Sequence, residues 1–423
     1  KKDQENLEIK FEKIKVKLDI KKGNLYFNTK NPKINFSNVD LPIIDIKIYV
    51  KFFPLLRSNL EISRSIVSYR EIDIEKIQKL VVFIKPSNIK SFLLNNIKNG
   101  QINGSLDLHY LKDLKINNYK VNGSVKNLEI YYKNKFNFIN TNFNFFADKE
   151  LVLINSFNSN FKEIPMTNGS LKIVIKNNYI IDGSIKTKVA YNEIKMRKMN
   201  SLFLDSKFIN NNEINLNADL LHKFSLNFSK QLKLVDYNYN LTGAIKDLII
   251  DLKNNIKPLF VVDEISKITL NENKVQLFIN KKNKNSLKLE GNHKLNNSNF
   301  EKYVIEDNFS LNKHNVIINL NINNEIDFKL INYNKKAQDK GSINCNFTFN
   351  KGKLDLKKFE FKESQSTIVL QGLKLNEKNN FKGFKNIKIK TFKDNIIQNY
   401  FDIQYGKNIT VTGSNYDSSN IIE

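Results

Sequence analysis

The 423-residue chain contains one cysteine, four histidines, six prolines and no tryptophan. A single cysteine excludes a disulfide scaffold and any cysteine-built zinc or iron–sulfur site. The low proline and glycine content excludes collagen-like and proline-rich architectures. No run approaches the roughly 18 consecutive apolar residues of a membrane-spanning helix. Because the chain begins with Lys1 rather than Met, we expect that an N-terminal signal or anchor segment has been removed.

Catalytic motifs are also missing. The sequence has no P-loop, no G-x-G-x-x-G, no H-E-x-x-H and no G-x-S-x-G pattern. Cys345 is in phase with Ile343 and Phe347, which favours a small apolar filler over a nucleophile. We therefore expect no enzymatic activity, no cofactor and no metal site. The four histidines are scattered and are expected to be ordinary surface or loop residues: His109, His222, His293 and His314.

Positive charge dominates, with 68 basic and 43 acidic residues and a net charge of +25. Nearly all of the basic residues are lysines, whereas arginine provides most bidentate recognition of bases and phosphates. The lysines alternate with apolar residues, as at Lys15 and Lys17. This pattern is typical of a sheet face that is exposed to solvent. The alternative is a basic surface that contacts anionic lipid headgroups. We expect no nucleic-acid partner.

Alternation of apolar and polar residues is the dominant pattern of the chain. It places apolar side chains on one face of a strand and is typical of antiparallel sheets. Changes of phase, as between Leu356 and Phe359, predict β-bulges. The clearest alternating segments are 14–20, 44–50, 106–110, 171–175, 316–320, 343–349, 354–356, 387–391 and 409–411.

Helical patterns are scarce. Apolar spacing predicts a short helix over 74–83 and a second over 87–97, with Ser87 as its N-cap and Gly100 after its end. A third candidate is 258–265. An internal repeat aligns 119–130 with 239–250, where Tyr, Gly, Lys, Leu and Ile recur at a constant offset. Repeats of this kind predict a body in which each unit packs on its neighbours.

The alternating pattern leaves two interpretations open. The apolar faces either fill the closed core of a β-sandwich or β-solenoid, as in a structural or adhesive surface protein, or they line an open groove for an apolar ligand. A strand of five to six residues spans about 17–20 Å, and one bilayer leaflet contains about 15 Å of hydrocarbon. An apolar row is thus about as long as an acyl chain. Periodicity alone does not choose between core and groove.

Three regions of the chain, the middle and both ends, resemble the AsmA-like proteins of the YhdP type. In the middle of the chain, the family has a proline, then a short helix, then the pattern N-(I/L)-x-x-G-x-(I/V), which leads into a strand. The matching residues here are Pro86, Asn96, Ile97, Gly100 and Ile102. The run 409–417 resembles the family's V-x-G-x-x-(F/Y)-D ending. The opening segments 22–25 and 54–62 are similar to the AsmA N-terminal pattern.

The resemblance implies a bridge-like lipid-transfer protein of the Gram-negative envelope. Its expected fold is all-β, a long curled antiparallel sheet that forms a repeating, elongated groove, with two or three short helices. Its expected function is to bind phospholipid acyl chains and to move lipid between inner and outer membranes. The expected location is the periplasm, with an inner-membrane anchor helix absent from this chain, and the two membranes reached through missing terminal segments. The resemblance also divides the chain into 1–73, an AsmA-like N-terminal β segment; 74–235, a central groove; and 236–423, a second groove repeat.

The apolar phases of the alternating segments predict the groove-lining residues. They are Ile14, Val16, Leu18, Ile44, Ile46, Ile48, Leu106, Leu108, Val121, Val125, Leu171, Ile173, Ile175, Ile343, Phe347, Phe349, Ile387 and Ile389.

Overall fold

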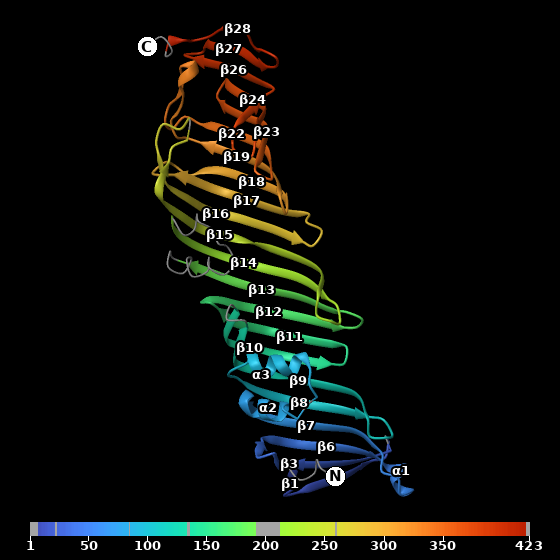
Figure 1. Ribbon diagram of the computed structural model, residues 1–423. Helices are drawn as coiled ribbons and strands as arrows, with labels where there is room; N and C mark the ends of the chain where they lie inside the picture. The colour runs from blue at the N-terminus through green and yellow to red at the C-terminus, as the bar shows by residue number, and fades with distance from the viewer. Residues whose placement is uncertain are drawn as a thin grey trace. The chain divides into compact units, whose positions relative to one another are not determined.

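The computed structural model describes residues 7–21, 23–83, 85–132, 136–191, 212–258 and 260–419. Strands make up 71% of the structure and helices 7%, and the main strands belong to one antiparallel sheet of 23 strands that is not closed (Figure 1). The predicted all-β antiparallel fold with few short helices is therefore confirmed.

The chain forms two compact units. Unit 1 comprises Lys1–Thr187 and Lys223–Asp236, and unit 2 comprises Lys188–His222 and Tyr237–Glu423. Three long strands contribute residues to both units: β13 (Tyr179–Tyr191), β14 (Asn212–Phe228) and β15 (Leu234–Ile256). The change of unit at Asp236 lies next to the predicted boundary at 235/236, whereas the position 73/74 lies inside unit 1.

The main sheet of unit 1 is a meander in which each strand pairs with the next main strand along the chain. A separate three-stranded sheet has the order β1–β4–β5 and consists of β1 (Leu7–Lys10), β4 (Lys33–Phe36) and β5 (Val39–Leu41). The main strands are β2 (Ile14–Asp19), β3 (Asn24–Lys30), β6 (Ile43–Lys51), β7 (Ile62–Asp73), β8 (Gln101–Tyr110), β9 (Ile116–Tyr132), β10 (Phe136–Asp148), β11 (Leu151–Phe161) and β12 (Ile164–Ile175), followed by β13.

Unit 2 continues the same antiparallel pattern from β15 onward. Its strands are β16 (Ile265–Asn280), β17 (Asn285–Leu295), β18 (Glu301–Ser310), β19 (Lys313–Ile322), β22 (Gly341–Asn350), β23 (Lys353–Glu363), β24 (Ser366–Leu375), β25 (Phe381–Gly383), β26 (Asn386–Lys393), β27 (Ile396–Tyr405) and β28 (Ile409–Asn415). Between β19 and β22 the chain forms a small pair, β20 (Ile326–Phe328) and β21 (Tyr333–Lys335), joined by the 3₁₀ turn η1 (Lys329–Ile331).

Two of the three predicted helices are present. They are α2 (Ile74–Val81) and α3 (Asn88–Asn96), and the Ser87 hydroxyl caps α3 by accepting a bond from the Lys90 backbone N–H at 3.1 Å. The predicted helix at 258–265 is wrong: the described residues there are not helical, and Val261 forms a β-bridge with Ile326. Sequence reasoning also missed α1 (Phe52–Leu56), where Pro54 is compatible with the first turn of a helix.

Short turns join most strands, and several need a left-handed backbone. Lys351 and Gly352 have φ of 48° and 82°, and Asp394 and Asn395 have φ of 51° and 63°. Two consecutive residues with positive φ are typical of the type I′ hairpin, whose twist matches that of the flanking strands. Such turns place consecutive strands side by side, which explains the meander.

The internal repeat occupies equivalent places in the two units. Gly123 in β9 pairs with Gly104 of β8, and a Cβ on Gly123 would overlap with the carbonyl oxygen of Asn103. Gly243 in β15 occupies the corresponding place in unit 2, where a Cβ would overlap with the carbonyl oxygen of Asp219. The repeated glycine thus permits a close approach of backbones that no larger residue allows.

We expect Gly243→Ala to lower the free energy of unfolding by about 1–3 kcal/mol, because the added methyl group overpacks the strand pair. Gly406→Ala is the matched control in the same unit, since its Cβ would meet nothing closer than the Asn408 carbonyl oxygen at 3.8 Å. Thermal or denaturant unfolding of both variants checks the expectation. Equal stability of the two would contradict it.

Candidate functional site

The predicted groove residues of unit 1 share one face of the sheet, which we call the apolar face of unit 1. Residues that pair directly across antiparallel strands point to the same side. The pairing therefore identifies one continuous row across ten strands. It runs through Ile14, Thr29, Ile46, Val67, Leu106, Val121, Ala147, Val152, Ile173 and Ile181.

The remaining unit 1 predictions follow from this row by the two-residue period of a strand. On the same strands and the same face lie Val16, Leu18, Ile48, Leu108, Val125, Leu171 and Ile175. Ile44 is the exception. A register shift in β6 makes Ile43 the partner of Tyr69, and the Ile44 side chain is 40% exposed.

The predicted residues of unit 2 also share one face, the apolar face of unit 2. Ile343 pairs with Phe361, Phe361 with Ile368, and Ile368 with Ile389. Phe347 and Phe349 follow Ile343 at two-residue steps, and Ile387 precedes Ile389 at the same spacing. The half-buried Cys345 lies in this row between Ile318 and Phe359, which fits its interpretation as an apolar filler.

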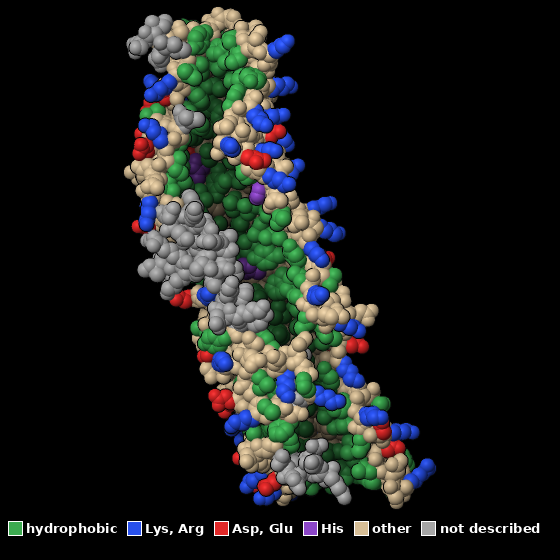
Figure 2. Space-filling model, viewed as in Figure 1, with side chains coloured by type: hydrophobic (Ala, Val, Ile, Leu, Met, Phe, Trp, Pro, Cys, Tyr) green, Lys and Arg blue, Asp and Glu red, His purple; other side chains and the backbone are tan. Residues whose placement is uncertain are grey.

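Parts of both apolar faces are open to solvent. In unit 1, Ile14, Val16 and Leu18 of β2 are 52%, 55% and 46% exposed, and in unit 2 Phe349 and Val411 are 42% and 61% exposed. Figure 2 shows the hydrophobic side chains lining a hollow in each unit, with charged side chains outside it. Extended exposed apolar surface marks a place that binds a ligand, a membrane or another protein.

The chain covers other parts of these faces itself. In unit 1, α2 and α3 lie on the sheet near β8–β10 (Figure 1), and Ile74 of α2 packs with the buried Val125 and Leu128 of β9. In unit 2, the segment from β20 to β21 and Val261 lie on β22–β27. There Ile326 and Phe361 are completely buried. Each unit therefore has covered and uncovered stretches of apolar face.

An apolar cavity of about 640 Å³ lies beside the covered stretch of unit 2. Pockets that bind small molecules commonly have about 300–1,000 Å³ and predominantly apolar linings. The lining includes the predicted Ile387 and Ile389, together with Leu330, Ile331, Phe401, Ile403, Val411 and Tyr416. Ile331, Ile389 and Phe401 also belong to the buried cluster, so one wall of the cavity is fixed by the core.

Three histidines lie on the apolar face of unit 2, which sequence reasoning missed. His293 is 5% exposed, and its Nε2 lies 2.8 Å from the Asn321 carbonyl oxygen. His222 Nδ1 lies 2.7 Å from the Tyr239 hydroxyl, and His314 Nδ1 lies 2.7 Å from Asp307 Oδ2. Burial lowers the pKa of His222 and of His293, so both imidazoles are neutral at pH 7. The signal was available, because His293 continues the phase of Leu287 and Leu289.

Within the described ranges, no group of three or more His, Cys, Asp or Glu side chains could hold a metal ion. Burial raises the pKa of the Cys345 thiol, which disfavours the reactive thiolate. In the same part of the chain, none of the helices is long and apolar enough to cross a membrane.

Comparison with known proteins adds no assignment. The chain matches no family model, and no curated protein is significantly similar to it.

We expect the His293 ring to titrate with a midpoint below the ordinary value of about 6.5. Because this pKa is depressed on folding, the neutral ring stabilises the fold above pH 6.5, and that contribution is lost as the pH falls through the folded-state pKa. Proton NMR of the imidazole C–H signals, assigned with a His293→Gln variant, measures the midpoint. A value at or above 6.5 would disprove the inference.

Proposed function

We propose that this protein binds phospholipid acyl chains on its two apolar faces and moves lipid between the inner and outer membranes of a Gram-negative envelope. The observation that carries the proposal is the predominantly apolar row of paired residues in each unit, together with the exposure of part of each face. The segments that resemble AsmA-like proteins of the YhdP type support the same conclusion. They also support a periplasmic location with an inner-membrane anchor.

The dimensions of the faces suit an acyl chain. β18 and β19 have 10 residues each, and a strand of that length spans about 33 Å. One leaflet of a bilayer contains about 15 Å of hydrocarbon. An extended acyl chain can therefore lie along one strand of the apolar face, with its headgroup in water at the border of the sheet.

The side chains suit movement along the face as well as binding. They are mainly Ile, Leu, Val and Phe, which attract hydrocarbon without direction, at about 25 cal/mol per Å² of apolar surface removed from water. Because each contact is weak, an acyl chain can move along the apolar face without breaking any strong bond. Burial lowers the pKa of His222 and of His293, which favours the neutral imidazole at these two places on the face.

A structural or adhesive protein with a closed core is the alternative. The covered stretches of both units favour this alternative, because in those stretches other segments of the chain pack on the apolar face and form a core. The sheet, however, is not closed, and apolar side chains remain exposed beyond the covered stretches. Lipid stoichiometry separates the two functions.

Ile173→Glu tests the proposal most directly. It places a carboxylate on the apolar face of β12, and burying that charge against hydrocarbon is strongly unfavourable. We expect the variant, purified without detergent, to contain about half the wild-type lipid per chain or less, as counted by mass spectrometry of extracted lipid.

The matched control is Val174→Glu on the opposite face of the same strand, where Val174 pairs with Ile180. This variant should retain the wild-type lipid content, and circular dichroism should show both variants folded. Equal lipid content in the two variants, or a wild-type protein that is folded and free of lipid, would refute the proposal and favour the structural alternative.

A further inference from the structure

The turns at the two ends of the unit 2 strands differ in charge. The turns 281–284, 311–312, 351–352 and 376–380 lie at the same end, because Asn285 pairs with Phe309, Phe309 with His314, and His314 with Phe349. We call this end the basic rim. Its exposed lysines are Lys281, Lys282, Lys284, Lys313, Lys351, Lys353 and Lys378, and its acidic residue is Glu377.

The opposite rim of unit 2 carries both signs. The segments that connect the strands there, 257–264, 323–340 and 394–395, contain acidic residues as well as lysines. The acidic residues are Asp263, Glu264, Glu325, Asp327, Asp339 and Asp394. The positive charge of unit 2 is therefore concentrated at one border of the apolar face. Figure 2 shows lysine side chains along this border of unit 2.

Several lysines elsewhere on unit 2 form ion pairs with acidic residues. On its polar face, Lys288 lies 3.0 Å from Glu306, and Lys358 lies 3.2 Å from Glu360. On the basic rim, Glu377 lies 3.4 Å from Lys353. Among the described residues, no carboxylate lies within 4 Å of the ammonium groups of Lys282, Lys284 or Lys351. These three charges are available to an external anion.

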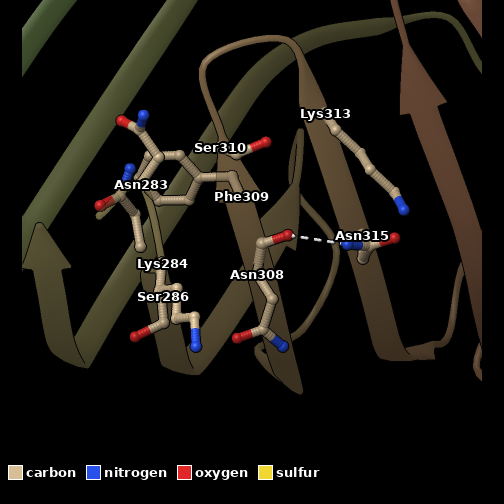
Figure 3. A pocket seen from close by; sticks show the side chains of 9 residues that line it. Asn283, Lys284, Ser286, Asn308, Phe309, Ser310, Lys313 and Asn315 are labelled. Atoms are coloured by element: carbon tan, nitrogen blue, oxygen red, sulfur yellow. Dashed lines mark hydrogen bonds between the residues drawn. The ribbon is translucent and has the colours of Figure 1, made fainter. Parts of the chain in front are cut away.

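A polar recess of about 350 Å³ lies within the basic rim. Figure 3 shows Lys284 on one side of it and Lys313 on the other, with Asn308 and Asn315 between them. The Asn315 amide donates to the Asn308 carbonyl oxygen at 3.1 Å. The lining also includes Asn283, Ser286 and Ser310 and contains no carboxylate. Ammonium, amide and hydroxyl groups in this arrangement suit the oxygens of a phosphate.

The recess lies mainly on the polar side of the sheet, because Ser286 pairs with Asn308 and Asn308 with Asn315, in the phase of the Lys288–Glu306 pair. Only its border reaches the apolar face, at Phe309. Phe309 lines the recess and stacks on His314 of the apolar face, with ring centroids 5.6 Å apart and an interplanar angle of 8°. Two residues further along the strands, Leu287 pairs with Asp307 and Asp307 with Val316. The Asp307 carboxylate is already engaged by His314. Phe309 thus lies where the border of the apolar face meets the basic rim.

We infer that the basic rim of unit 2 binds the phosphate of anionic phospholipid headgroups through the ammonium groups of Lys282, Lys284 and Lys351. The inference rests on the proposed function and adds the class of lipid. A headgroup with net negative charge gains from the lysines, whereas a zwitterionic headgroup brings an ammonium group that offsets the gain. The rim therefore selects anionic over zwitterionic phospholipid.

The test uses the full chain and vesicles of equimolar phosphatidylglycerol and phosphatidylcholine. The protein is incubated with them and repurified, and mass spectrometry gives the ratio of the two bound lipids. Because each lysine near an anionic lipid surface contributes about a fivefold factor, we expect wild-type protein at low salt to be enriched about fivefold or more in phosphatidylglycerol. High salt should reduce the enrichment, since it screens exposed charges.

The decisive variant replaces Lys282, Lys284, Lys313 and Lys351 by Gln. Its control replaces Lys257, Lys329, Lys336 and Lys340 of the opposite rim by Gln, which changes the net charge equally within the same unit. Loss of the enrichment in the first variant and its retention in the second would support the site.

Four results would overturn the inference. Equal enrichment in all three proteins would show that the basic rim does not select lipid. Equal loss in both variants would assign the selection to net charge rather than to this rim. Lipid bound without enrichment by the wild type would refute the headgroup site and leave the proposed function intact, whereas no bound lipid of either kind would refute both.

Discussion

The register of the strand pairs is the constraint on which the rest of this structure depends. A slip of one residue in any pair would move its apolar side chains to the polar face, and every later strand would follow. Two features maintain the register: short turns whose residues have a left-handed backbone conformation, and β-bulges that lie at the same level in neighbouring strands. In β23, Lys357 is the extra residue between the pairs Asn346–Lys358 and Phe347–Leu356. In β24, Gly372 with φ of 72° stands at the same level, so both strands change phase together and Leu356 and Leu373 still share the apolar face.

An apolar face of this kind must be covered by something. A second sheet is the common solution in all-β proteins, and this chain instead uses short segments. The helices α2 and α3 cover part of unit 1, and the segment from β20 to β21 covers part of unit 2. These segments bury a core that stabilises each unit, while the exposed remainder is free to bind hydrocarbon. In each unit, the stretch that stabilises the fold and the stretch that we propose binds lipid are thus different parts of one face.

Charge is distributed as systematically as apolar surface. Several lysines on the polar faces, such as Lys288 and Lys388, lie beside acidic residues of neighbouring strands, where the pairs stabilise little but balance the local charge. On the basic rim of unit 2, no carboxylate among the described residues lies within 4 Å of the ammonium groups of Lys282, Lys284 or Lys351. The net charge of +25 is therefore a poor guide to partners by itself, because its meaning depends on where the unbalanced part lies.

The sequence alone determined the fold class, most strands, two helices and the phase of the groove residues. It could do so because alternation, helical spacing and caps are local properties, and because consecutive strands joined by short turns pair with each other. Seventeen of the predicted residues keep their phase for that reason, while Ile44 lies at a register shift in β6 that no local pattern marks.

Tertiary structure decided the rest. Residues 258–265 are not helical because Val261 joins a core formed with Ile326, more than sixty residues away in the chain, and His293 is buried because neighbouring strands enclose it. Which lysines share a rim depends on which strand ends meet in space, and that is a property of the whole sheet rather than of any segment of the sequence.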